Sequence, residues 1–188
     1  MLGFKHVGTR YMRLKIMTPL EHAQSMFQKM PPEVFDLWLR PFIEADGWPF
    51  SSIYADTRDT AWREYFVGES IGMVAQLTWE RKRLPLSISL FNPESVIMIN
   101  DIIEAHMRDV NKPIAKIKNG KARESFFRSR KFIECTGRVH TPVVVRGELG
   151  DFEILDGNHR IAAAFSLGLD ESFFLDTWIG HRKANACN

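Results

Sequence analysis

The stretch His140–Leu169, which reads HTPVVVRGELGDFEILDGNHRIAAAFSLGL, decides the fold of this chain. Its first half predicts a hairpin over residues 142–155, because a β-branched run is joined through a glycine-containing turn to a second run of similar length. Its second half predicts a helix that ends near Gly168, since alanine and leucine favour helices and glycine favours the position after one. A closing strand is expected at residues 173–179. This order predicts an α+β fold with a mixed sheet flanked by helices.

Upstream of this stretch, the sequence predicts several helices and one more strand. The segment 18–30 begins with a capping box and ends at two prolines, which is typical of a short helix. Residues 84–91 alternate apolar and polar side chains, which predicts a strand with one solvent-facing side. Further helices are expected over residues 31–47 with a break near Pro41, over 95–110, and over 122–134. The apolar stripe expected on the 95–110 helix consists of Ile97, Ile99, Ile102, Ile103 and Met107.

The length and composition fit one domain, residues 84–188, with a mainly helical N-terminal extension, residues 1–83, packed on it. Of the 188 residues, 45% are hydrophobic and 26% are charged, which excludes a mostly disordered chain. No apolar run approaches the ~20 residues of a membrane span, and the N-terminal residues lack the apolar core of a signal peptide. With only two cysteines, Cys135 and Cys187, a disulfide framework is not expected. We therefore expect a cytoplasmic protein without a membrane span.

Positive charge is concentrated between residues 108 and 146. This block holds eleven lysines and arginines against three acidic residues, a local charge of +8 in a chain whose net charge is only +2. Such segregation indicates a surface that binds a polyanion such as DNA, because neutralised phosphates release their counterions. A solvated basic surface with no ligand is an equally simple interpretation. The candidate DNA contacts are Lys116, Lys118, Lys121, Arg128 and Lys131.

The candidate site is Asp156-Gly157-Asn158-His159-Arg160, which lies between a predicted strand and a predicted helix. The first amides of a helix lack intrahelical partners and the helix dipole is positive there, so an anion is stabilised. Glycine permits a tight turn and a close approach to a ligand. Histidine and arginine add hydrogen-bond donors, and a guanidinium can hold two phosphate oxygens. These residues together predict a phosphate-binding turn.

A purely structural interpretation of the same five residues is also open. In it, Asp156 or Asn158 caps the helix and His159 is exposed to solvent. Arg160 then pairs with an acidic residue such as Asp151 or Glu153. The five residues alone do not decide between the two interpretations.

The region from Arg138 to Ile179, roughly a quarter of the chain, resembles the signature region of the ParB/sulfiredoxin superfamily. The shared features are a proline before a β-branched strand, a hairpin, and a Gly-x-His-Arg turn that opens an alanine-rich helix. In that superfamily the turn holds the phosphates of a nucleoside triphosphate, ATP in sulfiredoxins and CTP in ParB proteins. The resemblance therefore implies that Gly157, Asn158, His159 and Arg160 bind the phosphates of ATP or another nucleoside triphosphate.

Departures from the superfamily pattern narrow the expected activity. Sulfiredoxins place a reactive cysteine where this chain has Asn158, and an amide cannot act as a thiolate nucleophile. We do not expect a centromere-binding clamp, because the DNA-binding and dimerisation domains of partition ParB proteins are not recognisable after Trp178. The closer resemblance is to the plasmid Osa-type fertility-inhibition proteins. It implies ATPase-like and DNase-like activity that inhibits conjugative or T-DNA transfer by a competing system.

A mechanistic hypothesis assigns roles to individual residues. Mg²⁺ would bridge the phosphate oxygens, with Asp156 as the nearest carboxylate to hold the metal or orient water. Arg160 would stabilise charge on the transferred phosphoryl group, and His159 would donate a proton. The expected partners are DNA, a nucleoside triphosphate, and type IV secretion or coupling proteins. The alternative is a non-catalytic module that senses nucleotide or blocks a type IV secretion component by binding to it.

Overall fold

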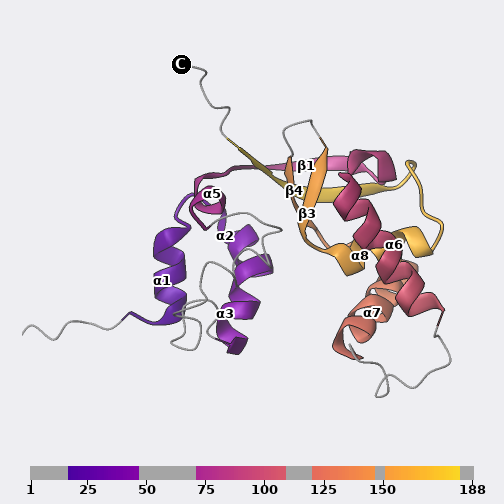
Figure 1. Ribbon diagram of the computed structural model, residues 1–188, viewed down its shortest axis with the longest axis horizontal. Helices are drawn as coiled ribbons and strands as arrows, with labels where there is room; N and C mark the ends of the chain where they lie inside the picture. The colour runs from indigo at the N-terminus through magenta and orange to yellow at the C-terminus, as the bar shows by residue number, and fades with distance from the viewer. Residues whose placement is uncertain (1–16, 47–70, 109–119, 147–150, 183–188) are drawn as a thin grey trace, which may run out of the picture.

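The computed structural model describes residues 17–46, 71–108, 120–146 and 151–182, which form helices and a four-stranded sheet (Figure 1). The α+β class expected from the sequence is confirmed. The elements in chain order are α1 (Pro19–Met26), α2 (Pro32–Val34), the π-helical η1 (Phe35–Leu39), α3 (Arg40–Asp46), α5 (Ile71–Gln76), β1 (Thr78–Pro85), the 3₁₀ segment η3 (Ile88–Leu90), α6 (Pro93–Met107), α7 (Gly120–Thr136), β2 (Val143–Arg146), β3 (Phe152–Asp156), α8 (Asn158–Ser166) and β4 (Phe174–His181).

The sheet is mixed, with the strand order β1-β4-β2-β3. Strands β2 and β3 form the expected antiparallel hairpin, and β2 runs parallel to β4. This parallel pairing needs a crossover between β2 and β4, which β3 and α8 supply. The register aligns Val143 with both Asp156 and Trp178, so the end of β3 lies level with the middle of β4. The sheet therefore delivers the chain to the start of α8 at a fixed position.

Strand β1 differs from the strand expected over residues 84–91. It occupies Thr78–Pro85 and pairs antiparallel with β4 along its whole length, and the segment after it contains the 3₁₀ turn η3. Most of its side chains before Leu84 are exposed, because it is an edge strand. The sequence of β1 is largely charged and does not alternate apolar and polar residues. Pairing with β4 therefore sets the position of this strand. The expected boundary between residues 83 and 84 falls inside this strand.

The two faces of the sheet carry separate hydrophobic clusters. Successive residues of a strand point to opposite faces, and Ile154 and Leu155 of β3 accordingly belong to different clusters. Leu155 packs with the N-terminal helices, in a cluster that includes Phe35 and Trp38 and is contacted by Trp178. Helices α6, α7 and α8 pack on the other side, as Figure 1 shows. The N-terminal helices thus share a core with the sheet.

Local sequence signals position most of the helices. The hydroxyl of Thr18 accepts a hydrogen bond from the Glu21 amide, which confirms the capping box of α1. The Asn92 side chain accepts from the Ser95 amide at the start of α6. On α6 the expected apolar stripe is wrong at Ile97, which is 60% exposed, because the buried face contains Ser95, Ile99 and His106 instead. Among the described residues, no helix has the length and hydrophobicity of a membrane span.

Candidate anion site at the start of α8

The turn from β3 into α8 is built on Gly157. This residue has φ +104°, a conformation that side chains with a Cβ rarely adopt. A Cβ at Gly157 would lie 2.9 Å from Pro142 Cβ and 3.1 Å from Arg160 Nη2. The sequence suggested that glycine serves the close approach of a ligand. In the structure the space beside Gly157 is filled by side chains of the protein itself.

The first turn of α8 has no side-chain cap among the described residues. The expectation that Asp156 or Asn158 caps the helix is therefore wrong. The amides of Arg160 and Ile161 both donate to the Gly157 carbonyl oxygen, at 2.9 Å. The amides of Asn158 and His159 are the donors that an uncapped helix start offers to an anion.

Arg160 pairs with Asp156, one helical turn before it. The two side chains are 18% and 24% exposed, so the ion pair is partly shielded from water. Pairing with Asp151 or Glu153, the structural alternative, is not found; the Glu153 carboxylate instead lies 3.8 Å from the Arg182 guanidinium. Two residues to which the sequence assigned catalytic roles thus neutralise each other.

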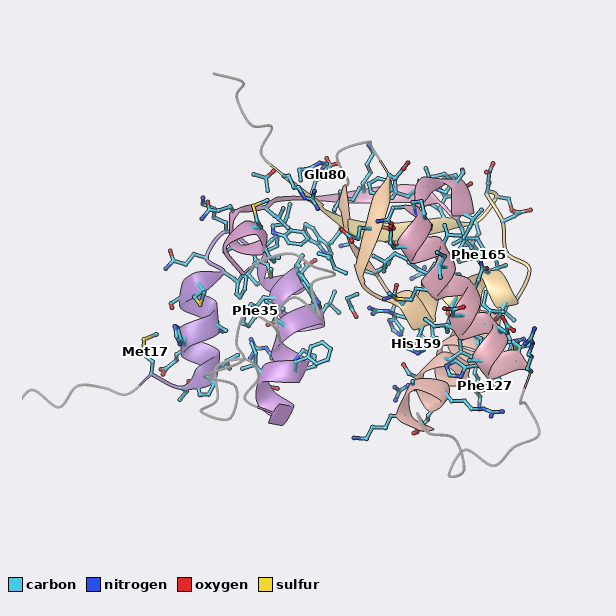
Figure 2. All side chains as sticks on the ribbon, viewed as in Figure 1. Met17, Phe35, Glu80, Phe127, His159 and Phe165 are labelled. Atoms are coloured by element: carbon cyan, nitrogen blue, oxygen red, sulfur yellow. The ribbon has the colours of Figure 1, made fainter. Side chains whose placement is uncertain are left out.

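His159 faces the neighbouring helices. Its ring stacks on that of His106 from α6, with a centroid distance of 5.7 Å and an angle of 30° between planes. His106 is only 6% exposed and also contacts Phe126 of α7, at 5.1 Å between centroids. Figure 2 shows His159 at the start of α8 and Phe127 on the adjacent α7. The expectation that His159 is a solvent-exposed side chain, in the structural alternative, is therefore wrong.

Arg123 adds a buried positive charge to this group. It lies on the inner face of α7, is 2% exposed, and its guanidinium is 5.4 Å from the centroid of the Phe127 ring. We call the set His106, Arg123, Asn158, His159 and Arg160, with Asp156, the α8 site. Three helices contribute to it, and packing of α8 against both α6 and α7 holds them together.

Electrostatics keep the two histidines of the α8 site uncharged at neutral pH. Burial lowers the pKa of His106, and the charge of Arg123 lowers it further. Burial also lowers the pKa of His159, as do the charges of His106 and Arg160, against a smaller opposing effect of Asp156. Both effects disfavour the imidazolium form, whose ordinary pKa is about 6.5.

Two polar atoms on the uncharged side chains of the α8 site are buried without a hydrogen-bond partner in the described part of the chain. They are His106 Nδ1 and Asn158 Oδ1. Buried polar atoms nearly always have partners in folded proteins, and an unmatched one raises the question of a ligand or water. The α8 site therefore has unused hydrogen-bonding capacity beside an uncapped helix start.

Sequence reasoning found the turn but missed His106 and Arg123. His106 lies seven residues after the fully buried Ile99, a spacing that places both on one face of a helix. This spacing was the available signal for its burial. Arg123 was counted in the basic block as a surface charge, and no local pattern distinguishes it from its exposed neighbours.

The basic block divides between two faces of α7. Lys121, Arg128 and Lys131 are exposed, and helical spacing places them on the side opposite Phe126 and Ile133. Lys116 and Lys118 lie outside the described residues. The predicted DNA contacts that the structure describes thus form one exposed surface, whereas Arg123 faces inward.

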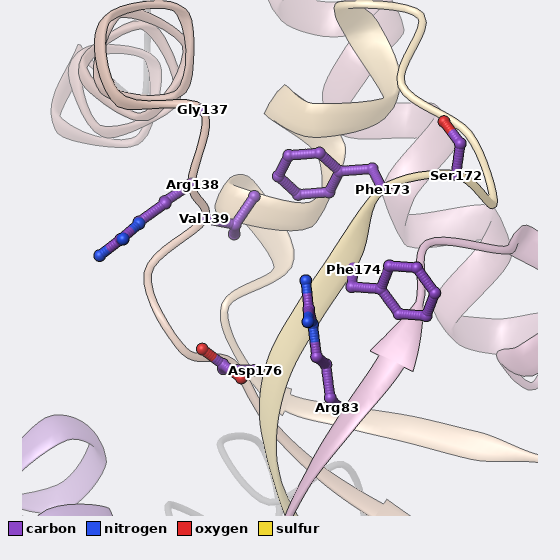
Figure 3. A pocket seen from close by; sticks show the side chains of 8 residues that line it. All are labelled: Arg83, Gly137, Arg138, Val139, Ser172, Phe173, Phe174 and Asp176. Carbon is purple, nitrogen blue, oxygen red and sulfur yellow. The ribbon is translucent and has the colours of Figure 1, made fainter.

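A second cationic feature lies apart from the α8 site. A groove of about 470 Å³ runs between the end of β1, the start of β4 and the residues after α7 (Figure 3). Arg83 and Arg138 line it together with Asp176, and the Arg83 guanidinium lies 4.8 Å from the centroid of the Phe174 ring. The groove thus has two arginines and one carboxylate among its lining residues.

Comparisons of the chain with protein-family models, with curated proteins and with solved structures gave no match. The proposed function therefore rests on the geometry of the α8 site and on the sequence.

Proposed function

We propose that the α8 site binds the phosphate groups of a nucleoside triphosphate and that the protein hydrolyses it. The observation that carries this proposal is the uncapped start of α8, which has His159 and Arg160 in its first turn. Cationic and donor groups in that position stabilise a phosphate. The resemblance of residues 138–179 to the ParB/sulfiredoxin superfamily independently suggests the same ligand and the finer fold assignment.

Binding of a phosphate requires an exchange of partners at Arg160. In the free protein its guanidinium is held by the Asp156 carboxylate. A phosphate oxygen competes for the same donors, and a bidentate guanidinium contact compensates for the lost pair. The amides of Asn158 and His159 then orient the phosphate, and Arg160 stabilises charge that develops during transfer.

His159 is suited to proton transfer only when a ligand is present. Its lowered pKa keeps the ring neutral in the free protein, which makes it a poor proton donor. A phosphate placed beside the ring raises that pKa, because a nearby negative charge favours the imidazolium. The role of proton donor expected from the sequence therefore depends on prior phosphate binding.

The donor set fits Mg²⁺ only through Asp156. Mg²⁺ bound to nucleotide phosphates takes one or two protein carboxylates, and Asp156 is the carboxylate at the turn. Once Arg160 turns to the phosphate, the Asp156 oxygens become available. Bound there, Mg²⁺ would neutralise phosphate charge.

We also propose that the exposed face of α7 holds DNA through Lys121, Arg128 and Lys131. The resemblance to Osa-type proteins suggests DNA cleavage and inhibition of conjugative or T-DNA transfer as the biological setting. Phosphate contacts from such a face position a strand without reading its sequence.

The alternative function is a non-catalytic module that senses nucleotide and binds a type IV secretion component. The pairing of Asp156 with Arg160 favours it, because two of the three candidate catalytic residues are engaged with each other. In this case nucleotide would break the ion pair and change the surface near the turn, without hydrolysis.

Turnover measurements separate the two functions. ATP hydrolysis and cleavage of linear DNA are measured with Mg²⁺ for the wild type, for Arg160→Ala and for Arg83→Ala, an arginine of the Figure 3 groove. We expect Arg160→Ala to abolish hydrolysis while circular dichroism shows a folded protein, and Arg83→Ala to remain active. Unchanged turnover in Arg160→Ala removes Arg160 from the mechanism. Nucleotide binding by the wild type without any turnover supports the sensing module.

A further inference from the structure

We propose that His106 and His159 bind the terminal phosphate of the ligand as a dianion together with one added proton, which the two imidazoles share. This inference rests on the proposed function. It identifies the terminal phosphate as the part of the ligand that lies deepest in the α8 site. It assigns His106 of α6, which the resemblance does not cover, to the binding site.

The geometry supports a site that continues from the helix start toward α6. His159 lies in the first turn of α8, and His106 stacks on it from the side of α6. His106 is more than nine-tenths buried, and its Nδ1 atom has no hydrogen-bond partner in the described segments. The uncapped start of α8 is the first observation that points to a ligand. The buried and unmatched Nδ1 atom of His106, on a ring that stacks on the first-turn histidine, is the second.

The charged groups around the histidine pair explain the added proton. Arg123 faces His106 from α7, while Arg160 and Asp156 face His159 from α8 and the end of β3. Asp156 is paired with Arg160. Burial and the nearby charges of Arg123 and Arg160 therefore disfavour a further proton on the imidazole pair. A bound dianion reverses this balance, so the imidazole pair gains a proton with the ligand.

The direction of the pH dependence follows from linkage. The histidine pKa values lie below about 6.5 in the free protein and rise when the dianion binds. Between the free and the bound pKa values, each increase in pH removes the proton that binding requires. The association constant therefore falls as pH rises, by up to about tenfold per pH unit for one proton.

Sulfate is the probe for the test, because it has the shape of phosphate and stays a dianion across the neutral range. Titration calorimetry is carried out between about pH 6.5 and 8.5 in buffers of different ionisation enthalpy. We expect proton uptake of up to about one per sulfate and a falling association constant. His106→Gln should bind more weakly and lose most of the pH dependence. His22→Gln, a change at an exposed histidine of α1, should match the wild type.

The outcomes distinguish this inference from the proposed function. A non-hydrolysable ATP analogue is titrated in parallel with the wild type and with Arg160→Ala. If the analogue binds in an Arg160-dependent way but sulfate binding takes up no proton, or His106→Gln behaves like the wild type, the inference is overturned and the proposed function stands. If neither the analogue nor sulfate binds the wild type, both are overturned.

A second measurement keeps the inference testable if His106→Gln does not fold. Imidazole resonances of the wild type are followed by NMR through a pH titration with and without sulfate. We expect the His106 or His159 resonance to titrate at higher pH when sulfate is present. Titration curves that do not move with sulfate overturn the inference.

Discussion

The guanidinium of Arg160 lies directly over the backbone of Gly157, so close that a Cβ there would be 3.1 Å from Nη2 and 3.2 Å from Nε. Arg160 is held in this position by its ion pair with Asp156, and Pro142 Cβ also lies 2.9 Å from the position that a Cβ would take. The turn is therefore shaped by contacts within the protein before any ligand arrives. Pre-formed turns of this kind reduce the ordering that binding requires.

Replacement of Gly157 by alanine should destabilise the fold. The new Cβ would add contact with Pro142 at 2.9 Å to the strain of φ +104°, a combined cost of about 2 to 4 kcal/mol. Gly137→Ala is the matched control, because Gly137 has φ +63° but no atom within 4 Å of the added Cβ. Its cost should be only about 1 kcal/mol. Urea denaturation measures both, and equal costs would contradict the close packing of Gly157.

Replacement of Asp156 by asparagine should separate binding from hydrolysis. The change removes a negative charge next to Arg160 and frees the guanidinium for phosphate. We expect the affinity for a non-hydrolysable ATP analogue to rise by about threefold to tenfold. We expect Mg²⁺-dependent turnover to be lost, since no carboxylate remains at the turn. Asp151→Asn, at the residue directly before β3, is the control and should change neither property. An unchanged affinity in Asp156→Asn would exclude competition between Asp156 and phosphate.

The free energy of unfolding should fall on mild acidification. The folded-state pKa values of His106 and His159 are lower than the unfolded value of about 6.5, so the unfolded chain binds more protons below that pH. Stability is therefore fully present above about pH 6.5 and is lost as pH falls through the folded pKa values, by up to about 1.4 kcal/mol per pH unit and proton. His106→Phe should flatten this dependence in urea titrations between about pH 7 and 5. A profile as steep as that of the wild type would argue against His106 as a source.

The exposed face of α7 should control the salt dependence of DNA binding. For each phosphate contact removed, the slope of log K against log salt concentration should decrease by about 0.9 for duplex DNA. Lys121→Ala, Arg128→Ala and Lys131→Ala should each lower the slope, measured by fluorescence anisotropy. Glu124→Ala, on the same exposed surface, should not lower it. Slopes that are the same for all four variants would place DNA elsewhere or exclude it.

Local signals in the sequence were sufficient for several elements and for the turn. The capping residues of α1 and α6 form hydrogen bonds within three residues, so no distant contact is needed to place those helix starts. Strand β3, Gly157 and α8 could also be predicted from local signals, because they follow one another directly in the chain. The backbone requirement of a positive φ is also local, which is why the glycine could be assigned to a turn from the sequence alone.

Tertiary packing decided the rest, because it depends on residues far apart in the chain. Strand β1 exists through pairing with β4, and its charged sequence gives no sign of that partner. Arg123 and the exposed lysines of α7 are chemically alike, and only the packing of α7 against α8 determines which of them is buried. The stacking of His106 on His159 needs α6 and α8 side by side. The sequence by itself therefore determined the position of the turn that we propose as an anion site, whereas the fold determined which distant side chains surround it.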